Sequence, residues 1–380
     1  MKLRKTQLAA AVGAALLAGG TAVQAQNLQV QLYGQVNRAM MFADDENQSR
    51  WFHVDGQPSS TRFGIQGTAQ AAPGLRIGAR IESEMKSNPS NVVNFGSTQP
   101  GTPSAGAVTT SAGTTVVLFA ERWLDLTFEG AWGKVNMGQG SGAADDASTI
   151  DLSGTAVVNG WCICDWGGGI SFVTAAGAPI TTIGASTDNM DFESRYDRIM
   201  YTTPVFGGFR AQAGFGQRTS AGEAVEASLW YSGKLAGEIQ AAIGWSSVNL
   251  GTGTGPTATD DRETIGGSVS WLHTSGFNVS LAYTDRDLDG VAGGRNAKHQ
   301  SAKLGYKTGP HAVSVTYTMV KDLSLAGDEV TAYSVGYVWN PIRWAEIYAA
   351  YIMYSLDHTR AGVGSANDIT VAVVGSRVRF

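Results

Sequence analysis

The sequence predicts an all-β fold, a transmembrane antiparallel β-barrel of sixteen strands, and three observations lead to that prediction. Apolar and polar residues alternate over sixteen separate stretches of the chain. Short turns and generally longer polar segments connect these stretches in strict succession. After residue 25 no segment approaches the roughly 18 consecutive apolar residues of a membrane-spanning helix, so strands are the spanning elements that remain.

Composition supports a large exported β protein. Charged residues make up 16% of the chain, below the roughly 25% usual in soluble proteins. The 49 glycines exceed the usual share of about 7%. The formal net charge of −5 offers no basic surface for nucleic acid. A secreted soluble β-sandwich would have a similar composition, so the strand pattern has to separate the two.

The N-terminal residues predict an export signal. A basic start precedes an apolar run over residues 8–20, and Val23-Gln24-Ala25 provides a small-residue cleavage site. The run is too short to span a bilayer. We therefore expect a signal peptide over residues 1–25 and a single barrel domain over residues 26–380.

The clearest strand pattern lies between Gly74 and Met85. Apolar Leu75, Ile77, Ala79 and Ile81 alternate there with residues that include Arg76, Arg80, Glu82 and Glu84. One apolar face and one charged face are expected where a barrel wall separates lipid from water. The predicted strands are 28–41, 61–70, 74–85, 117–130, 134–140, 196–203, 209–218, 223–231, 239–245, 263–273, 277–284, 298–307, 313–319, 330–339, 347–354 and 367–380.

The connections between these strands are asymmetric. Short turns are expected at 71–74, 131–133, 204–208, 232–237, 274–276, 308–310 and 340–345. The generally longer segments are 43–59, 86–115, 141–194, 219–222, 247–262, 286–297, 321–329 and 356–366. Outer-membrane barrels combine short periplasmic turns with longer external loops in this way. Aromatic residues near the turns suit one interfacial girdle: Trp132, Phe206, Phe209, Trp271, Phe277, Trp339, Trp344 and Phe380.

Four stretches and the C-terminus resemble the general trimeric porin family of Gram-negative outer membranes. The stretches are Leu32-Tyr33-Gly34, Ser60 to Glu82, Arg122 to Gly140, and Tyr201 to Phe209. The chain ends Val374-Gly375-Ser376-Arg377-Val378-Arg379-Phe380, which is similar to the terminal strand that this family's assembly machinery reads. The resemblance covers nearly the whole chain after residue 25 and implies that Phe380 is an assembly signal.

The resemblance also implies a pore constriction. In the family the third long loop, here about Ser141 to Asp191, folds into the barrel and faces cations on the wall. Opposed charges across a narrow channel produce a transverse field that selects permeants by charge. Each arginine has an alternative role as an ordinary ion-paired lumen residue. The candidate constriction residues are Arg62, Arg76, Arg80, Glu82, Glu84, Arg122, Asp145, Asp146, Asp151, Arg195, Arg198 and Arg210.

Two of these arginines have an unresolved orientation. Strict alternation places Arg122 on the lipid face with Leu124 and Leu126, whereas the resemblance implies a wall cation. Arg195 lies one position from where the family keeps an arginine. A β-bulge would shift the register and reconcile the two interpretations.

The third loop contains an unusual segment, Trp161-Cys162-Ile163-Cys164-Asp165-Trp166. Export to an oxidising compartment favours a disulfide between Cys162 and Cys164. Because only one residue separates them, such a disulfide closes a small, strained ring that is easily reduced. Free thiols, or a metal site that Asp165 or a histidine completes, are the alternatives.

Other motifs indicate no cofactor. Asp285-Arg286-Asp287-Leu288-Asp289-Gly290 matches the first half of a calcium loop, but Asn296 stands where the bidentate glutamate is required. We therefore expect an ordinary acidic external loop there. The five histidines are scattered, and no G-x-S-x-G motif suggests an outer-membrane barrel enzyme.

The resemblance implies a homotrimeric outer-membrane porin. Such a protein forms a water-filled channel for passive diffusion of ions and small hydrophilic solutes, without a cofactor or a metal. It contacts outer-membrane lipid and lipopolysaccharide and binds no nucleic acid. A substrate-specific uptake channel of the same fold is the alternative. The acidic loop favours cations and the wall arginines favour anions, so ion selectivity stays open.

Overall fold

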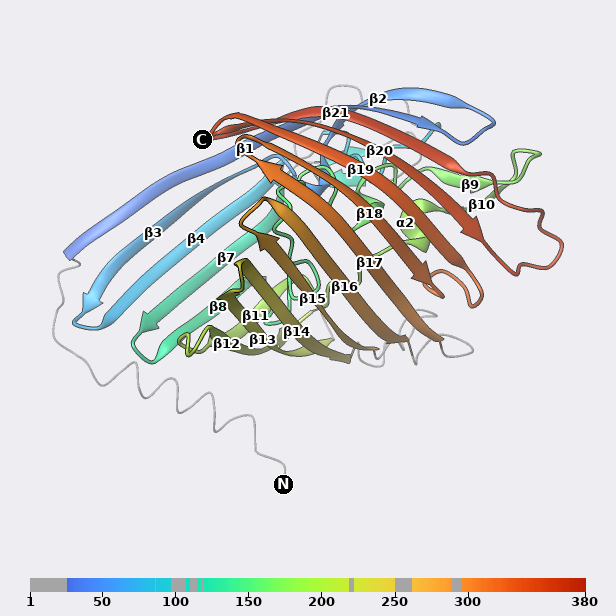
Figure 1. Cartoon of the computed structure of the whole chain (residues 1–380). Helices are drawn as coiled ribbons and strands as arrows, with labels where there is room; N and C mark the ends of the chain where they lie inside the picture. The colour runs from blue at the N-terminus through green and yellow to red at the C-terminus, as the bar shows by residue number, and fades with distance from the viewer. Residues whose placement is uncertain are drawn as a thin grey trace.

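The computed structural model describes residues 26–85, 87–96, 107–109, 115–117, 119–218, 222–249, 262–288 and 295–380. The predicted signal peptide therefore lies outside the described residues. Within these ranges, no helix has the length and apolar character needed to cross a membrane. The strands are long, tilted and arranged side by side around one barrel (Figure 1).

The prediction of a sixteen-stranded antiparallel barrel is confirmed. The main sheet has 17 strands, and all of them except the short β2 form the barrel wall. Strand β1 pairs with both β3 and β21, which closes the barrel. The wall strands are β1 (Gln26–Asp44), β3 (Arg62–Ala72), β4 (Leu75–Met85), β7 (Phe119–Gly130), β8 (Gly133–Ser141), β11 (Arg195–Thr202), β12 (Phe209–Gln217), β13 (Glu223–Lys234), β14 (Gly237–Asn249), β15 (Arg262–His273), β16 (Phe277–Leu288), β17 (Arg295–Thr308), β18 (His311–Lys321), β19 (Glu329–Ile342), β20 (Ala345–Asp357) and β21 (Ile369–Arg379).

The two faces of the wall differ as the alternation predicts. Leu229, Ile243, Ile265 and Leu281 point outward and are each about half exposed. Alternate residues of the same strands, such as Ser228 and Ser280, are buried on the inner side. Because every strand in a closed barrel has two partners, its backbone polar groups are satisfied without water, as lipid requires.

Strand β1 meets the C-terminus closely. The Gly34 amide donates to the Phe380 carbonyl at 2.9 Å, and the Phe380 amide donates back at 3.0 Å. A Cβ on Gly34 would lie 2.5 Å from the Phe380 ring and 2.9 Å from the Arg62 carbonyl oxygen. Only glycine therefore fits here. Gly375 has the same role under the Tyr348 ring, whose atoms would lie 2.5 Å from an added Cβ.

A short strand in the first loop was not predicted. Strand β2 (Ser49–Asp55) pairs with the C-terminal part of β1, from Arg38 to Asp44. The sequence predicts a continuous loop over residues 43–59 instead. The 3-10 helix η1 (Gln57–Ser59) then separates β2 from β3. The Gln35 and Asn37 side-chain amides each donate to the Ser59 carbonyl at 2.9 Å. These hydrogen bonds hold η1 against the inner side of β1.

The third loop, residues 142–194, folds into the barrel and packs against the inner side of the wall. It contains η2 (Ile163–Asp165), β9 (Ser171–Val173), β10 (Pro179–Thr182) and α2 (Ile183–Ser186). Its apolar residues, among them Trp166, Ile170 and Phe172, pack against inward-facing residues such as Met41 and Tyr354. The core therefore lies between this loop, the short strand β2, and the wall strands β1, β19, β20 and β21. A separate hairpin, β5 (Ala107–Thr109) and β6 (Thr115–Val117), lies in the second loop.

The segment that resembles a calcium loop is a strand over its described part. Strand β16 continues to Leu288, and Asp285 and Asp287 alternate with Arg286 along it. Arg286 is buried on the inner side, whereas Asp285 lies 3.9 Å from Lys298 in an ion pair. The expected external loop therefore begins later than predicted, and Asp289 and Gly290 lie outside the described residues. Asp285 and Asp287 share the outer face of an extended, paired strand, which lacks the tight turn that lets a calcium loop wrap around its cation.

Candidate functional site

A cavity of about 620 Å³ lies between the third loop and the barrel wall. Arginines line it from the wall strands and their ends: Arg62, Arg122, Arg195, Arg218, Arg262 and Arg286. Acidic residues of the third loop face them: Asp145, Asp146, Asp165, Asp188, Asp191 and Glu193. The folded chain thus brings together five of the predicted constriction residues, namely Arg62, Arg122, Arg195, Asp145 and Asp146.

Arg122 reaches the inner side through a β-bulge. The pairing of β4 with β7 shifts register between Glu82 and Ser83, which oppose Trp123 and Glu121 respectively, so Arg122 is the extra residue. Its Nε donates to Glu82 at 2.7 Å and its Nη1 donates to Glu84 at 2.9 Å. The bulge accounts for the conflict between strict alternation and the position of this side chain.

Glu82 and Glu84 do not line the cavity but lie beneath the arginines. Glu82 is 2% exposed and also accepts hydrogen bonds from Tyr33 and Arg80. Arg62 lies 3.8 Å from Glu82 and donates to Ser59 Oγ at 2.9 Å. These buried carboxylates fix the guanidinium groups of neighbouring strands, because an unpaired arginine would be costly to bury.

Three cavity arginines were not predicted. Arg218 follows β12, Arg262 begins β15 and Arg286 lies on β16. Glu193 pairs with Arg262 and lies 3.6 Å from Arg218. Arg286 donates to Thr264 Oγ1 and to the Phe192 carbonyl, both at 3.0 Å. Arg262 and Arg286 were assigned to external loops, and Glu193 was not singled out.

Three carboxylates of the third loop form a tight group. Oxygens of Asp145, Asp146 and Asp191 all lie within 4.8 Å of one another. Burial, with repulsion from Asp146, raises the pKa of Asp145 to about 6. Burial also raises the pKa of Asp191 well above its usual range, with repulsion from Asp145 and Asp146 contributing. Mutual repulsion between carboxylates this close opposes full ionisation of Asp145 and Asp191.

Hydroxyl side chains on the inner wall bind the backbone of the third loop. Ser228 donates to the Ala143 carbonyl. Ser268 accepts from the Ile150 amide at 2.9 Å and donates to the Ala147 carbonyl at 2.8 Å. Farther round the barrel, Ser314 and Ser334 bind Thr155 and Asn159: Thr155 Oγ1 lies 2.7 Å from Ser314 Oγ, and Ser334 donates to Asn159 Oδ1 at 2.7 Å. The loop is therefore fixed to the wall along much of its length.

Asp151 does not face the cavity. It forms an ion pair with Lys303 of β17, and the two side chains are 2% and 0% exposed. Lys303 also donates to the Asn159 carbonyl and lies 4.6 Å from the centre of the Trp161 ring. Asp151 is thus a buried attachment of the third loop to the wall.

The remaining predicted arginines lie elsewhere on the inner wall. Arg76 and Arg80 line a second recess with Asp125, Glu129 and Lys134. Arg198 is buried against Asp125 at 3.0 Å and donates to the Ser141 carbonyl at 2.8 Å. Arg210 lies 4.9 Å from the centre of the Trp230 ring. None of these four lines the main cavity.

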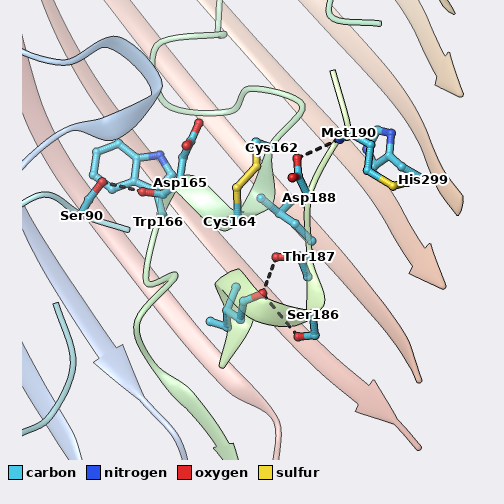
Figure 2. The surroundings of a disulfide bond; sticks show 12 residues. Ser90, Cys162, Cys164, Asp165, Trp166, Ser186, Thr187, Asp188, Met190 and His299 are labelled. Carbon is cyan, nitrogen blue, oxygen red and sulfur yellow. Dashed lines mark hydrogen bonds between the residues drawn. A yellow bond between two sulfur atoms is a disulfide. The ribbon is translucent and has the colours of Figure 1, made fainter. Parts of the chain in front are cut away.

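Cys162 and Cys164 form a disulfide. Figure 2 shows it in the third loop next to Asp165. Cys162 and Asp165 line the main cavity. The two sulfurs and an Asp165 oxygen lie within 4.8 Å of one another. The cysteine–aspartate group and the three-carboxylate group are the two side-chain groups in the described ranges that have the spacing of metal ligands.

Comparison with known proteins agrees with this architecture. A family model described as Gram-negative porin matches residues 9–359. No curated protein matches the chain in sequence. Among solved structures, an anion-selective porin from Comamonas acidovorans is similar with a TM-score of 0.63 and 18% identity, over 93% of this chain and 100% of that one.

Two further solved structures are similar. The trimer form of in-vitro folded OmpT, an outer membrane protein of Vibrio cholerae, has a TM-score of 0.57 and 15% identity, over 93% of this chain and 100% of that one. A mutant Rhodopseudomonas blastica porin has a TM-score of 0.53 and 15% identity over the same shares of 93% and 100%. At these identities the likeness supports the fold.

Proposed function

The chain belongs to the Gram-negative porin family, and we propose that its passive diffusion channel prefers small anions. As a member of that family, the chain forms an outer-membrane channel for ions and small hydrophilic solutes. The preference for anions rests on one observation, the close group that three acidic residues form opposite the arginines of the main cavity. Six arginines and six acidic residues line this cavity.

The two sets of charges respond differently to their surroundings. Arginine stays protonated in proteins. The close contact of Asp145, Asp146 and Asp191 favours retention of at least one proton. Each retained proton leaves the arginines in excess among the charged residues that line the cavity. A positive field in a water-filled constriction concentrates anions and repels cations.

The cavity arginines and acids are, in this proposal, the two sides of the constriction. Arg62, Arg122 and Arg195 come from β3, β7 and β11. Arg218, Arg262 and Arg286 come from the end of β12 and from β15 and β16. The similarity to an anion-selective porin supports the same preference. A substrate-specific channel would need a site for one solute, and no feature of the cavity favours that function.

We also infer that the channel is a homotrimer and that residues 1–25 direct its export. The trimer form of the similar Vibrio cholerae protein supports the assembly. The basic start and apolar run support the export signal. Contacts with outer-membrane lipid and lipopolysaccharide follow from the apolar outer face and the external loops.

Purified protein in a planar bilayer tests these proposals. Conductance should appear in groups of three equal steps, and the reversal potential in a potassium chloride gradient should have the sign of chloride preference. Folded protein without conductance would refute the channel. A reversal potential of the opposite sign would refute only the anion preference. Saturable block by one solute would favour a substrate-specific channel.

A further inference from the structure

We propose that the Cys162–Cys164 disulfide is a redox-controlled metal site inside the channel. Small hydrophilic thiols that enter the cavity open the disulfide, and the resulting dithiol binds a thiophilic divalent cation together with Asp165. The proposal uses the channel of the proposed function as the access route. Its binding chemistry depends only on the residues of the third loop.

Accessibility is the first step of the argument. Both cysteines are half-buried rather than enclosed, and Cys162 lines the main cavity with Asp165. A disulfide that spans a single residue closes a small ring, and strained or exposed disulfides are the ones most open to exchange. A thiolate in the cavity can therefore reach a sulfur of this disulfide.

Two exchange steps balance the chemistry. A small thiolate attacks one sulfur and forms a mixed disulfide, while the other cysteine leaves as a thiolate. A second small thiolate attacks the mixed disulfide at the sulfur that came from the first small thiol. This step releases a small-molecule disulfide and the second cysteine thiolate. Two electrons pass from the two small thiols to the protein.

The segment around the cysteines does not depend on the disulfide for its position. The Tyr354 hydroxyl donates to the carbonyls of Ile163 and Trp166, at 2.9 Å in each case. The Trp161 indole donates to the Ile150 carbonyl at 3.2 Å, and the Trp166 indole donates to the Val158 carbonyl at 3.0 Å. These contacts lie on both sides of the cysteines, so the backbone should persist after reduction.

The opened site has a suitable set of ligands. The Cys162 and Cys164 sulfurs and an Asp165 oxygen lie within 4.8 Å of one another, which small rotations of the side chains convert to a common centre. Two thiolates and a carboxylate suit Zn²⁺ or Cd²⁺ and leave one position for water. Mg²⁺ and Ca²⁺ prefer oxygen ligands and should not compete. A bound cation would add positive charge and obstruct the cavity.

Cd²⁺ binding to the folded full-length protein tests the proposal. Treatment with 2-mercaptoethanol should make two cysteines per chain reactive to a maleimide, where untreated protein shows none. The treated protein should bind one Cd²⁺ per chain, measured by equilibrium dialysis and by thiolate-to-cadmium absorption. Asp165→Asn should weaken Cd²⁺ binding by about tenfold or more. Asp188→Asn, a matched loss of charge in the same cavity, should change it by less than about twofold.

Several outcomes would overturn the proposal. Reactive cysteines before treatment, or cysteines that react only after unfolding, would contradict an accessible disulfide. Equal Cd²⁺ affinity of Asp165→Asn and Asp188→Asn would remove Asp165 from the site. A Cys162→Ser, Cys164→Ser double variant that still binds Cd²⁺ equally well would place the metal elsewhere. None of these measurements uses conductance, so a failure of the channel function would be separate.

Discussion

Replacing Lys303 with methionine should release the third loop without unfolding the barrel. The Lys303 ammonium is fully buried, binds Asp151 and the Asn159 carbonyl, and lies over the Trp161 ring. Methionine keeps much of the side-chain volume but leaves the Asp151 carboxylate buried without a counterion. Removing one partner of a buried ion pair costs about 3–5 kcal/mol. The backbone pairing of β17 does not involve this side chain, so the barrel ladder should stay intact.

The cost should appear in the loop, because Asp151 can reach water only if the loop leaves the wall. A change of 3–5 kcal/mol corresponds to a shift of roughly 10²- to 4 × 10³-fold between attached and detached loop. Single-channel recordings should show greater current noise, and larger neutral solutes should permeate in a liposome swelling assay. Gel mobility of the unheated protein should still report a folded barrel.

Two further variants separate the lost ion pair from general damage. Lys307→Met removes an exposed lysine from the same strand and should leave both noise and size limit unchanged. Combining Lys303→Met with Asp151→Asn removes the unpaired charge and should recover part of the loss. If Lys303→Met alone has the noise and size limit of the unmodified channel, the ion pair does not hold the loop.

Three other predictions concern charge and closure. Anion preference should increase as pH falls through about 6, because the pKa of Asp145 is raised to about 6 and its protonation removes negative charge; a reversal potential independent of pH between 5 and 8 would contradict this. Arg122→Gln should shift the reversal potential toward cations, whereas Lys321→Gln outside the cavity should not. Gly34→Ala should lower the free energy of unfolding by about 1–3 kcal/mol, because its Cβ meets the Phe380 ring and the Arg62 carbonyl. Equilibrium unfolding in urea measures the loss, and Gly67→Ala, with no atom nearer than 3.9 Å, is the tolerated control.

The wall of the barrel was predictable because two simple rules act on it. Lipid on one side and water on the other impose an alternation of period two. Each short connection between neighbouring strands also needs residues that favour a tight turn. The short turns at Pro73-Gly74 and Gly309-Pro310 lie where the sequence predicts them. The register shift at Arg122 could not be predicted with the same rule, because a bulge changes which face follows in the alternation.

The attachment of the third loop left only a faint signal. Ser228, Ser268, Ser314 and Ser334 all occupy inward positions of wall strands, and each binds the loop. A serine at an inward position could equally face the water inside the barrel without binding the loop. The sequence therefore contains the wall's half of each hydrogen bond without identifying the loop atom that completes it.

Two of the missed arginines, Arg262 and Arg286, have a clear physical cause. The upper ends of the strands extend to where both faces of the wall are polar, so the apolar half of the alternation disappears while strand pairing continues. On β15 and β16, Glu263, Asp285 and Asp287 occupy outward positions at that level. Between them, inward residues such as Arg286 have polar neighbours on both sides in the sequence. The sequence therefore predicts an external loop there, although the backbone is still paired. Strand ends defined by hydrophobicity are consequently too short, and the cavity charges closest to the external mouth are those most readily overlooked.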